Sequence, residues 1–386
     1  MTSARERQQK RRQQRESMVR RAGPNEPQIR SASEKPRREM KIPGGRFWFL
    51  VPLGVIVLFG VIAVLGSIKP PEQVVPANGI WLDASWTHVE RPDAELIAYS
   101  DALRRSEIGH IFAFVSSLKA DVTWAGLPDE RNRFSDVEPL VRAFPARLRQ
   151  VYPGARIYGW IEVRASTPDG YRLDSPQVQR VVAEFAARVV RLYGYDGVFL
   201  DVKPVFDGNE DYLALLRAVR ANLGLEVPIA VSVAPDYTPE GTALNLPAQI
   251  APGTYWAREF KQRVALQADK VVVMAYNSYI ADPIDYLEWV AFQVESFSEA
   301  MLGMDSGSRL MISLPNYANN PPAHFSAAES LAGGLDGVAR GRNRLSAAQA
   351  AMLGGIAIYS DRDLTSSDFD LVRSKWLESA PVEADG

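Results

Sequence analysis

The sequence predicts an α/β fold in which eight parallel β-strands alternate with helices and close into a barrel. Short, continuously apolar runs recur from residue 80 onward, and longer amphipathic stretches separate them. Eight such pairs in about 300 residues are typical of a (β/α)8, or TIM, barrel. An open, doubly wound sheet is the alternative, but no glycine-rich phosphate turn follows the first apolar run. We therefore expect the closed barrel.

The apolar runs are the expected strands, because parallel strands covered by helices are buried on both faces. They are Ile80–Asp83, Ile111–Leu118, Arg156–Val163, Val198–Lys203, Ile229–Asp236, Val271–Tyr279, Leu310–Tyr317 and Ile356–Asp361. The helices expected between them include Asp93–Arg105, Asp136–Gln150, Gln177–Tyr193, Tyr212–Leu223, Trp256–Gln267 and Pro283–Met301. Two starts carry capping signals: Asp136 before Val137, and Ser175 followed by Pro176.

A single transmembrane helix is expected before the barrel. No residue from Phe47 to Ile68 is charged, and this length matches a hydrocarbon core of about 30 Å. Residues 1–46 hold 14 Lys and Arg against 5 Asp and Glu, which places the N-terminus in the cytoplasm. A cleaved signal peptide is the alternative, but the apolar segment and the arm before it are too long. We expect a single-pass signal anchor in the cell membrane, with everything after Lys69 outside the cytoplasm.

The remaining segments are expected to be short or unstructured. The basic arm, residues 1–46, is predicted to be disordered, and its charge could contact anionic lipid. We read it mainly as a topology signal and expect no nucleic-acid partner. Residues 69–79 form a proline-rich spacer, residues 80–380 the barrel, and residues 381–386 a tail.

Composition excludes several kinds of site. The chain has no cysteine, so it contains neither disulfides nor thiolate metal sites. It has three histidines, which makes a histidine-rich metal centre unexpected. We expect no metal and no cofactor.

The stretch from Asp196 to Pro204 is the most informative, because it reads as a buried strand that ends on charged side chains. Side chains alternate across a strand, so Phe199, Asp201 and Lys203 share one face. In parallel barrels, chemistry takes place at the carboxyl ends of the strands. A structural ion pair between Asp201 and Lys203 is the plainer alternative.

The same alternation applied to the other strands collects carboxylates and aromatic rings at one rim. The side chains expected there are Trp81, Asp83, Tyr158, Trp160, Glu162, Ser232, Asp236, Met274, Tyr276, Ser313, Pro315, Tyr317, Tyr359 and Asp361. Buried carboxylates are costly unless they are paired, so packing alone does not explain the set. Acidic groups flanked by rings suit a carbohydrate.

Four motifs resemble the chitinase-type family 18 glycoside hydrolases. They are Asp196-Gly197-x-x-x-Asp201-x-Lys203, Met274-Ala275-Tyr276-Asn277, Leu314-Pro315-Asn316-Tyr317 and Gly355-Ile356-Ala357-Ile358-Tyr359-Ser360. The resemblance covers about residues 79–380 and implies a TIM barrel that acts on a glycan. It implies that Asp201 orients the substrate's acetamido group, that Tyr276 supports it, and that Asn277 replaces a second acid.

The same resemblance implies one departure of consequence. The family's catalytic Glu position holds Lys203, and the first motif Asp is Phe199. A lysine is a poor acid for a sugar leaving group unless its pKa falls by several units. The family's mechanism therefore does not transfer unchanged.

Three functions remain open at this stage. The first is a hydrolase of a cell-envelope or extracellular polysaccharide, with Asp201 as nucleophile or base and Glu162 or Asp236 as the relocated acid. The second is a glycan-binding protein without catalysis, similar to chitinase-like lectins. The third is an envelope scaffold that binds a protein partner through the loop Lys119–Ser135, which contains Trp124.

Overall fold

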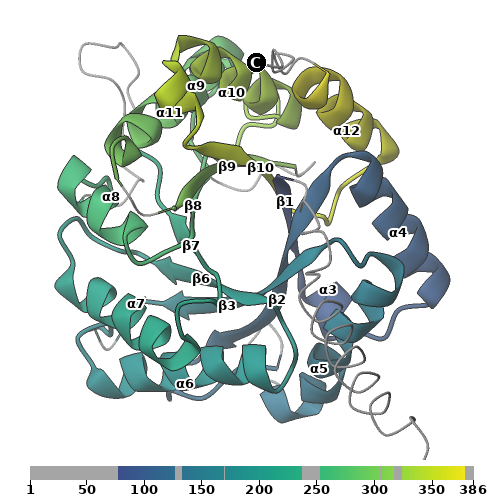
Figure 1. The fold of residues 1–386 in the computed structure, drawn as a ribbon, viewed down its shortest axis with the longest axis vertical. Helices are drawn as coiled ribbons and strands as arrows, with labels where there is room; N and C mark the ends of the chain where they lie inside the picture. The colour runs from purple at the N-terminus through teal and green to yellow at the C-terminus, as the bar shows by residue number, and fades with distance from the viewer. Residues whose placement is uncertain are drawn as a thin grey trace, which may run out of the picture. The chain divides into compact units, whose positions relative to one another are not determined.

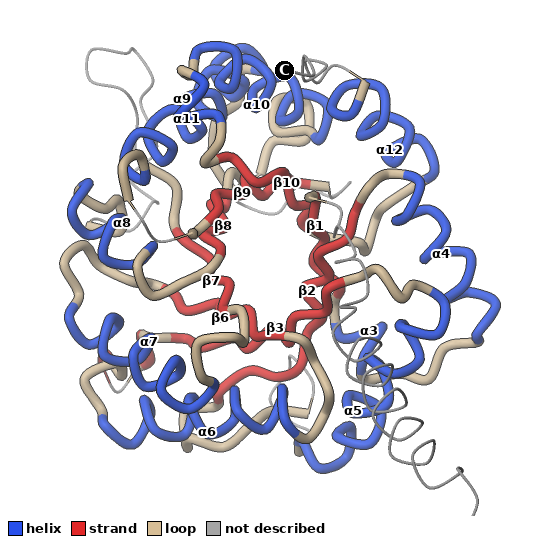
Figure 2. The backbone as a smooth tube through the Cα atoms, viewed as in Figure 1, coloured by secondary structure: helices blue, strands red, loops and turns tan. Residues whose placement is uncertain are grey.

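The computed structural model describes residues 77–126, 133–168, 170–236, 253–304, 307–316 and 324–378. Eight strands close into a barrel. They form an inner ring, and helices surround it (Figures 1 and 2). The strands close in the order β1-β10-β9-β8-β7-β6-β3-β2, and every neighbouring pair in the ring is parallel. The predicted TIM barrel is therefore confirmed.

The barrel strands are β1 (Asn78–Leu82), β2 (Ile108–Leu118), β3 (Arg156–Arg164), β6 (Gly197–Lys203), β7 (Ile229–Val233), β8 (Lys270–Met274), β9 (Arg309–Pro315) and β10 (Leu353–Tyr359). A small antiparallel pair, β4 (Ser166–Thr167) and β5 (Gly170–Tyr171), follows β3. The helices are α3 (Ala84–Thr87), α4 (Asp93–Arg105), α5 (Phe134–Val151), α6 (Pro176–Arg191), α7 (Glu210–Leu223), α8 (Arg258–Ala265), α9 (Pro283–Met301), α10 (Leu331–Arg344), α11 (Ala347–Ala350) and α12 (Ser366–Leu371). A π-helical turn, η1 (Val372–Leu377), continues α12.

All eight predicted strands are present, but five end earlier than predicted. β7 and β8 end at Val233 and Met274. Pro235, just beyond β7, has no N–H for a sheet hydrogen bond, and Asn277, just beyond β8, has a φ of 54°. The polar residues that follow these strands therefore lie in loops rather than on the sheet.

The helix starts agree with the sequence in one case and differ in the other. Ser175 caps α6, accepting a hydrogen bond from the Val178 N–H, and Pro176 is the first helical residue, as predicted. The prediction that Asp136 caps its helix is wrong, because α5 begins two residues earlier. Asp136 is instead the third helical residue, and its side chain accepts from the backbone N–H of the cap residue, Arg133.

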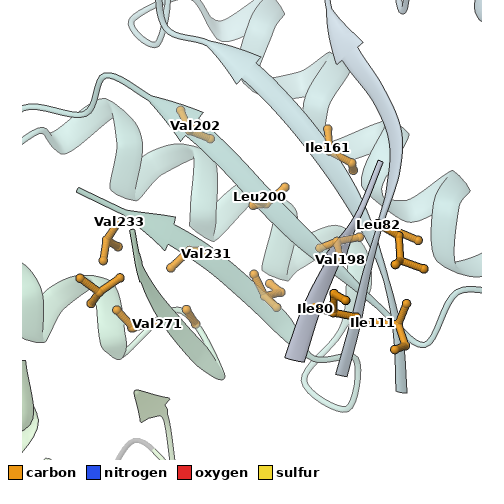
Figure 3. Packing of buried hydrophobic residues seen from close by; sticks show 14 of the residues in the cluster. Ile80, Leu82, Ile111, Ile161, Val198, Leu200, Val202, Val231, Val233 and Val271 are labelled. Carbon is orange, nitrogen blue, oxygen red and sulfur yellow. The ribbon is translucent and has the colours of Figure 1, made fainter. Parts of the chain in front are cut away.

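The two faces of the strands build two separate apolar clusters. The outward side chains pack against the helices, and Figure 3 shows part of this layer around Ile80, Val198, Leu200 and Val231. The inward side chains fill the barrel. They are Trp81, Phe112, Tyr158, Phe199, Ala230, Val272, Met311 and Ala357. The barrel is thus a packed core and not a pore.

Several predicted segments lie outside the described residues. These are the basic arm 1–46, the apolar segment 47–68, most of the spacer 69–79, and the tail 381–386. Among the helices within the described ranges, none has the length and apolar character needed to cross a bilayer.

Helix α10 packs closely on α9 through glycines. A Cβ built at Gly337 would lie 2.7 Å from the Leu287 carbonyl oxygen and from the Val290 Cβ. We predict that Gly337→Ala lowers the free energy of unfolding by about 1–3 kcal/mol, because the two helices must separate. Gly333→Ala in the same helix is the control: its Cβ would approach nothing closer than the Ser330 hydroxyl at 3.3 Å. Chemical denaturation of both variants would test this, and equal destabilisation would contradict it.

Candidate active site

The carboxylate of Asp201 lies inside the barrel near the carboxyl end of β6 and has no exposed surface. It accepts hydrogen bonds from the Ser232 hydroxyl at 2.7 Å and from the Trp160 indole Nε1 at 3.2 Å. The Lys203 ammonium lies 2.9 Å from the same carboxylate. A buried charge is tolerated when it is paired and hydrogen-bonded, and Asp201 meets both conditions.

Lys203 is held in its charged form. Burial works against the ammonium, but the charges of Asp201 and Glu162 outweigh it and raise the pKa of Lys203. Its side chain as a whole is 42% exposed. The predicted pairing of Asp201 with Lys203 is present in the structure.

Glu162 lies on the strand next to Asp201. Glu162 of β3 pairs in register with Asp201 of β6, and neighbouring strands lie about 4.8 Å apart. Its side chain is 20% exposed, and its Oε1 is 4.0 Å from the Arg164 Nε. The structure therefore brings together two of the three predicted carboxylates, and the charges of both act on the Lys203 ammonium.

Aromatic rings pack together beside these charges, and Tyr276 among them is buried. Tyr276 and Tyr359 stack with centroids 4.3 Å apart and planes 6° from parallel. Trp160 and Tyr359 are partly buried and pack on the interior cluster. Trp81 meets both edge-on, at 4.9 and 5.2 Å, and is itself completely buried. Trp81, which we expected at the ligand, is therefore assigned to the packing beneath these rings.

A buried glutamate that the sequence reasoning missed holds the loop after β8. Glu329 accepts hydrogen bonds from the backbone N–H groups of Asn277 and Ser278 and from the Ser278 hydroxyl. His324 Nδ1 lies 3.0 Å from the same carboxylate. Glu329 follows Asn277 by 52 residues and belongs to none of the four motifs, so no local signal pointed to it.

Known proteins were compared with this chain by sequence and by structure. No protein-family model matches the chain, and no curated protein matches it. Among solved structures, the chain is similar to a family GH18 chitinase from Cycas revoluta in complex with allosamidin, with 14% identity and a TM-score of 0.50. The match covers 78% of this chain and 99% of that one. The domain has a chitinase-like TIM-barrel fold.

Two further structures resemble the chitinase-like barrel. A mutant of the Cycas revoluta chitinase in complex with (GlcNAc)4 matches with 14% identity, the same coverage and a TM-score of 0.50. The spore cortex-lytic enzyme SleL from Bacillus cereus matches with 11% identity and a TM-score of 0.49, over 76% of this chain and 73% of that one.

Asp83 and Asp361 meet just beyond β1 and β10 of the chitinase-like barrel. Asp361 accepts from the Asp83 N–H at 3.0 Å and from the Trp86 indole. Burial, together with the charge of Asp83, raises the pKa of Asp361 to about 6. Burial also disfavours the charge of Asp83, but hydrogen bonds from Ser85 and Arg362 outweigh it and lower that pKa. The contacts of Asp361 thus join the strand ends to α3.

Asp236 was predicted inside the barrel beside Ser232, and that placement is wrong. Because β7 ends at Val233, Asp236 lies in the following loop, and its carboxylate binds Lys261 of α8 and Ser296 of α9. The Gln293 side chain exchanges hydrogen bonds with the Asp236 backbone. Asp236 therefore ties a loop to the helix layer.

Tyr317 was a predicted ligand contact, and Trp124 a predicted partner contact. Tyr317 lies outside the described residues. Trp124, proposed as a partner surface on the loop Lys119–Ser135, stacks on Phe185 of α6 with centroids 3.9 Å apart. Its ring is thus used in packing. Across the described ranges, no group of three or more His, Asp or Glu residues is arranged to hold a metal ion.

Removing Lys203 should destabilise the barrel. In Lys203→Met, the buried Asp201 keeps two neutral donors but loses its counter-charge. We predict a loss of about 2–3 kcal/mol at pH 7, below the loss for a fully buried pair because Lys203 is partly exposed. Lys375→Met, which breaks a more exposed pair with Asp336, should cost about 1 kcal/mol or less. Denaturant unfolding measures both, and equal losses would contradict the assignment.

Asp361 should titrate near pH 6. Its folded pKa lies above 3.8, the ordinary value of an aspartate, so the folded state holds this proton more tightly than the unfolded state. Its contribution to stability is therefore present at about pH 4 and is lost as the pH rises through about 6. Carboxyl carbon NMR should show this titration, and Asp83→Asn should lower its midpoint. An unchanged midpoint in that variant would exclude Asp83 as a cause.

Proposed function

We propose that the barrel binds a glycan at the mouth formed by the carboxyl ends of its strands. The observation that carries the proposal is the buried Asp201, held by Lys203, Ser232 and Trp160 beside the stacked rings of Tyr276 and Tyr359. Fixed charges orient sugar hydroxyls, and rings offer apolar faces for stacking. The similar chitinase bound to (GlcNAc)4 makes an N-acetylglucosamine oligosaccharide the first ligand to test.

Binding without hydrolysis accounts best for the charges at this mouth. Acid-assisted cleavage of a glycosidic bond needs a group that releases a proton near neutral pH. Lys203 has a raised pKa and keeps its proton, while Asp201 accepts hydrogen bonds through both oxygens. The family's mechanism would need a carboxylic acid where this chain has Lys203.

Hydrolysis by a relocated pair is the second candidate, favoured by the register of Glu162 beside Asp201. Adjacent strands allow a carboxyl separation near the roughly 5–5.5 Å of retaining enzymes. Glu162 would then be the acid and Asp201 the nucleophile. The alternative acid, Asp236, is engaged by Lys261 and Ser296, so we drop it from this scheme.

We infer the location and the class of ligand from the N-terminal sequence. The apolar segment 47–68 after a basic arm supports a single-pass anchor with the barrel outside the cytoplasm. A polysaccharide of the cell envelope or of the surroundings is then the available glycan. A scaffold that binds a protein remains the third function, to be judged by the experiment below.

The test measures binding and cleavage separately on the purified full chain. We expect (GlcNAc)4 to bind and Tyr359→Ala to weaken it about tenfold or more, because the stacking face is lost. Leu225→Ala is the control: this exposed side chain lies between α7 and β7, at the other end of the barrel. Absence of binding to (GlcNAc)4 and to a broader glycan array would refute the glycan proposal and favour a protein partner.

A reducing-end assay on the same samples decides between the two glycan functions. Binding without new reducing ends supports the lectin-like function. Release of reducing ends that is abolished in Glu162→Gln, with binding retained, would replace it with the relocated hydrolase. Lys203→Glu restores the family's acid position, and any activity gained there would identify this residue as the cause of inactivity.

A further inference from the structure

The amino-terminal opening of the barrel, opposite Asp201, gathers positive charge. Arg156, Lys270 and Arg309 are the first residues of β3, β8 and β9. Each lies two residues before an inward-facing side chain, so alternation places all three on the inner face of the sheet. His110 of β2 occupies the corresponding position before Phe112. We call this group of three cations and one imidazole the amino-terminal cation cluster.

Register places the members in neighbouring pairs. Arg156 is the partner of His110, and Arg309 is the partner of Lys270. Neighbouring strands are about 4.8 Å apart, so each pair is close. The two pairs lie on different sides of the strand ring in Figure 2, and their side chains start at the same end of the barrel.

The positive charges of this cluster disfavour one another. Burial lowers the pKa of Lys270 to about 8, opposed by Asp269 and reinforced by the charges of Arg156 and Arg309. Burial lowers the pKa of His110 to about 3, and Lys270 and Arg156 reinforce the effect. His110 is therefore neutral at pH 7. The charges act across the opening, from one pair to the other.

No carboxylate within the described residues forms an ion pair with Arg156, Lys270 or Arg309. The nearby Asp269 binds Arg220 at 2.6 Å and the N–H of Ile229 at 2.7 Å.

Asp196, like Asp269, binds an arginine of the helix layer and a backbone N–H at a strand start. It binds Arg149 at 2.6 Å and the Ile157 N–H at 2.7 Å. Both aspartates thus cap a strand start and form an ion pair with an arginine of the helix layer, and neither forms an ion pair with the cation cluster.

A buried polar atom accompanies the cations. His110 is 7% exposed, and its Nδ1 has no hydrogen-bond partner in the part of the chain that the structure describes. Its ring packs against Tyr158 with centroids 5.8 Å apart. A buried polar atom without a partner is uncommon and costs stability. An oxyanion held by the neighbouring cations could accept from this imidazole.

We propose that the amino-terminal cation cluster binds a phosphate-type anion. Guanidinium groups match phosphate oxygens in a bidentate manner, and an ammonium adds a compact charge. A dianion would offset the repulsion among the three cations. This site lies at the end of the barrel opposite the proposed glycan mouth and is independent of it.

Two sources can supply this chemistry, namely free phosphate and the phosphate of a lipid headgroup. The chain enters β1 at this end of the barrel, at Asn78. The predicted membrane segment ends at Ile68, ten residues earlier in the sequence. The experiment therefore needs one arm for each source.

The test follows the thermal unfolding of the full chain in an uncharged detergent. One arm titrates inorganic phosphate against chloride at matched ionic strength. The other titrates monomeric dihexanoyl-phosphatidylglycerol against dihexanoyl-phosphatidylcholine. We expect the anion to raise Tm, and Arg156→Gln and Lys270→Gln each to weaken its apparent Kd about tenfold. Without anion, neither variant should lower Tm, because each removes repulsion.

Arg180→Gln is the matched control, since it removes one positive charge from an exposed position on α6. It should bind the anion as the unaltered chain does. Stabilisation by phosphatidylglycerol but not by inorganic phosphate would identify a lipid headgroup, and the converse a free anion. No stabilisation in either arm, or equal affinity in all three variants, would overturn the proposal.

Discussion

The carboxylate of Asp201 is fully buried inside this barrel. The arrangement of the mouth depends on the groups that compensate its negative charge. Asp201 can remain ionised there because Lys203, Ser232 and Trp160 all point their donors at it. These donors come from three strands, β3, β6 and β7, so the carboxylate also fixes how these strands face one another. The contacts of Asp201 therefore both set the charge at the mouth and hold three neighbouring barrel strands together.

The packing beneath the mouth explains why the rings lie where they do. Trp81 fills the barrel centre and meets Phe199, Trp160 and Tyr359 edge-on. In the family that the sequence resembles, the position of Phe199 is an Asp. Replacing a carboxylate by a ring in the interior makes this part of the barrel apolar and leaves Asp201 as the buried acid of β6.

Much of the fold could be predicted from the sequence, because buried parallel strands are apolar on both faces and strand–helix alternation repeats eight times. Alternation along β3 and β6 also placed Glu162 and Asp201 together correctly. It failed for Asp236, since the rule holds only while the residue is still in the sheet, and β7 ends three residues earlier. Glu329 could not be predicted, because its partners lie about 50 residues away in sequence and the contact exists only in the folded chain.

The hydrogen bonds of Glu329 to the loop after β8 affect the entropy cost of binding a ligand at the mouth. That loop carries Tyr276 and is also held by the Tyr286 hydroxyl, which donates to the Ala275 carbonyl at 2.9 Å. Because the Glu329 carboxylate and the Tyr286 hydroxyl both hold this loop, it is ordered before a ligand binds. Binding then costs little conformational entropy in the loop. Differences in affinity among ligands would then reflect how well each ligand fits the preformed site, because the rings would not move to accommodate it.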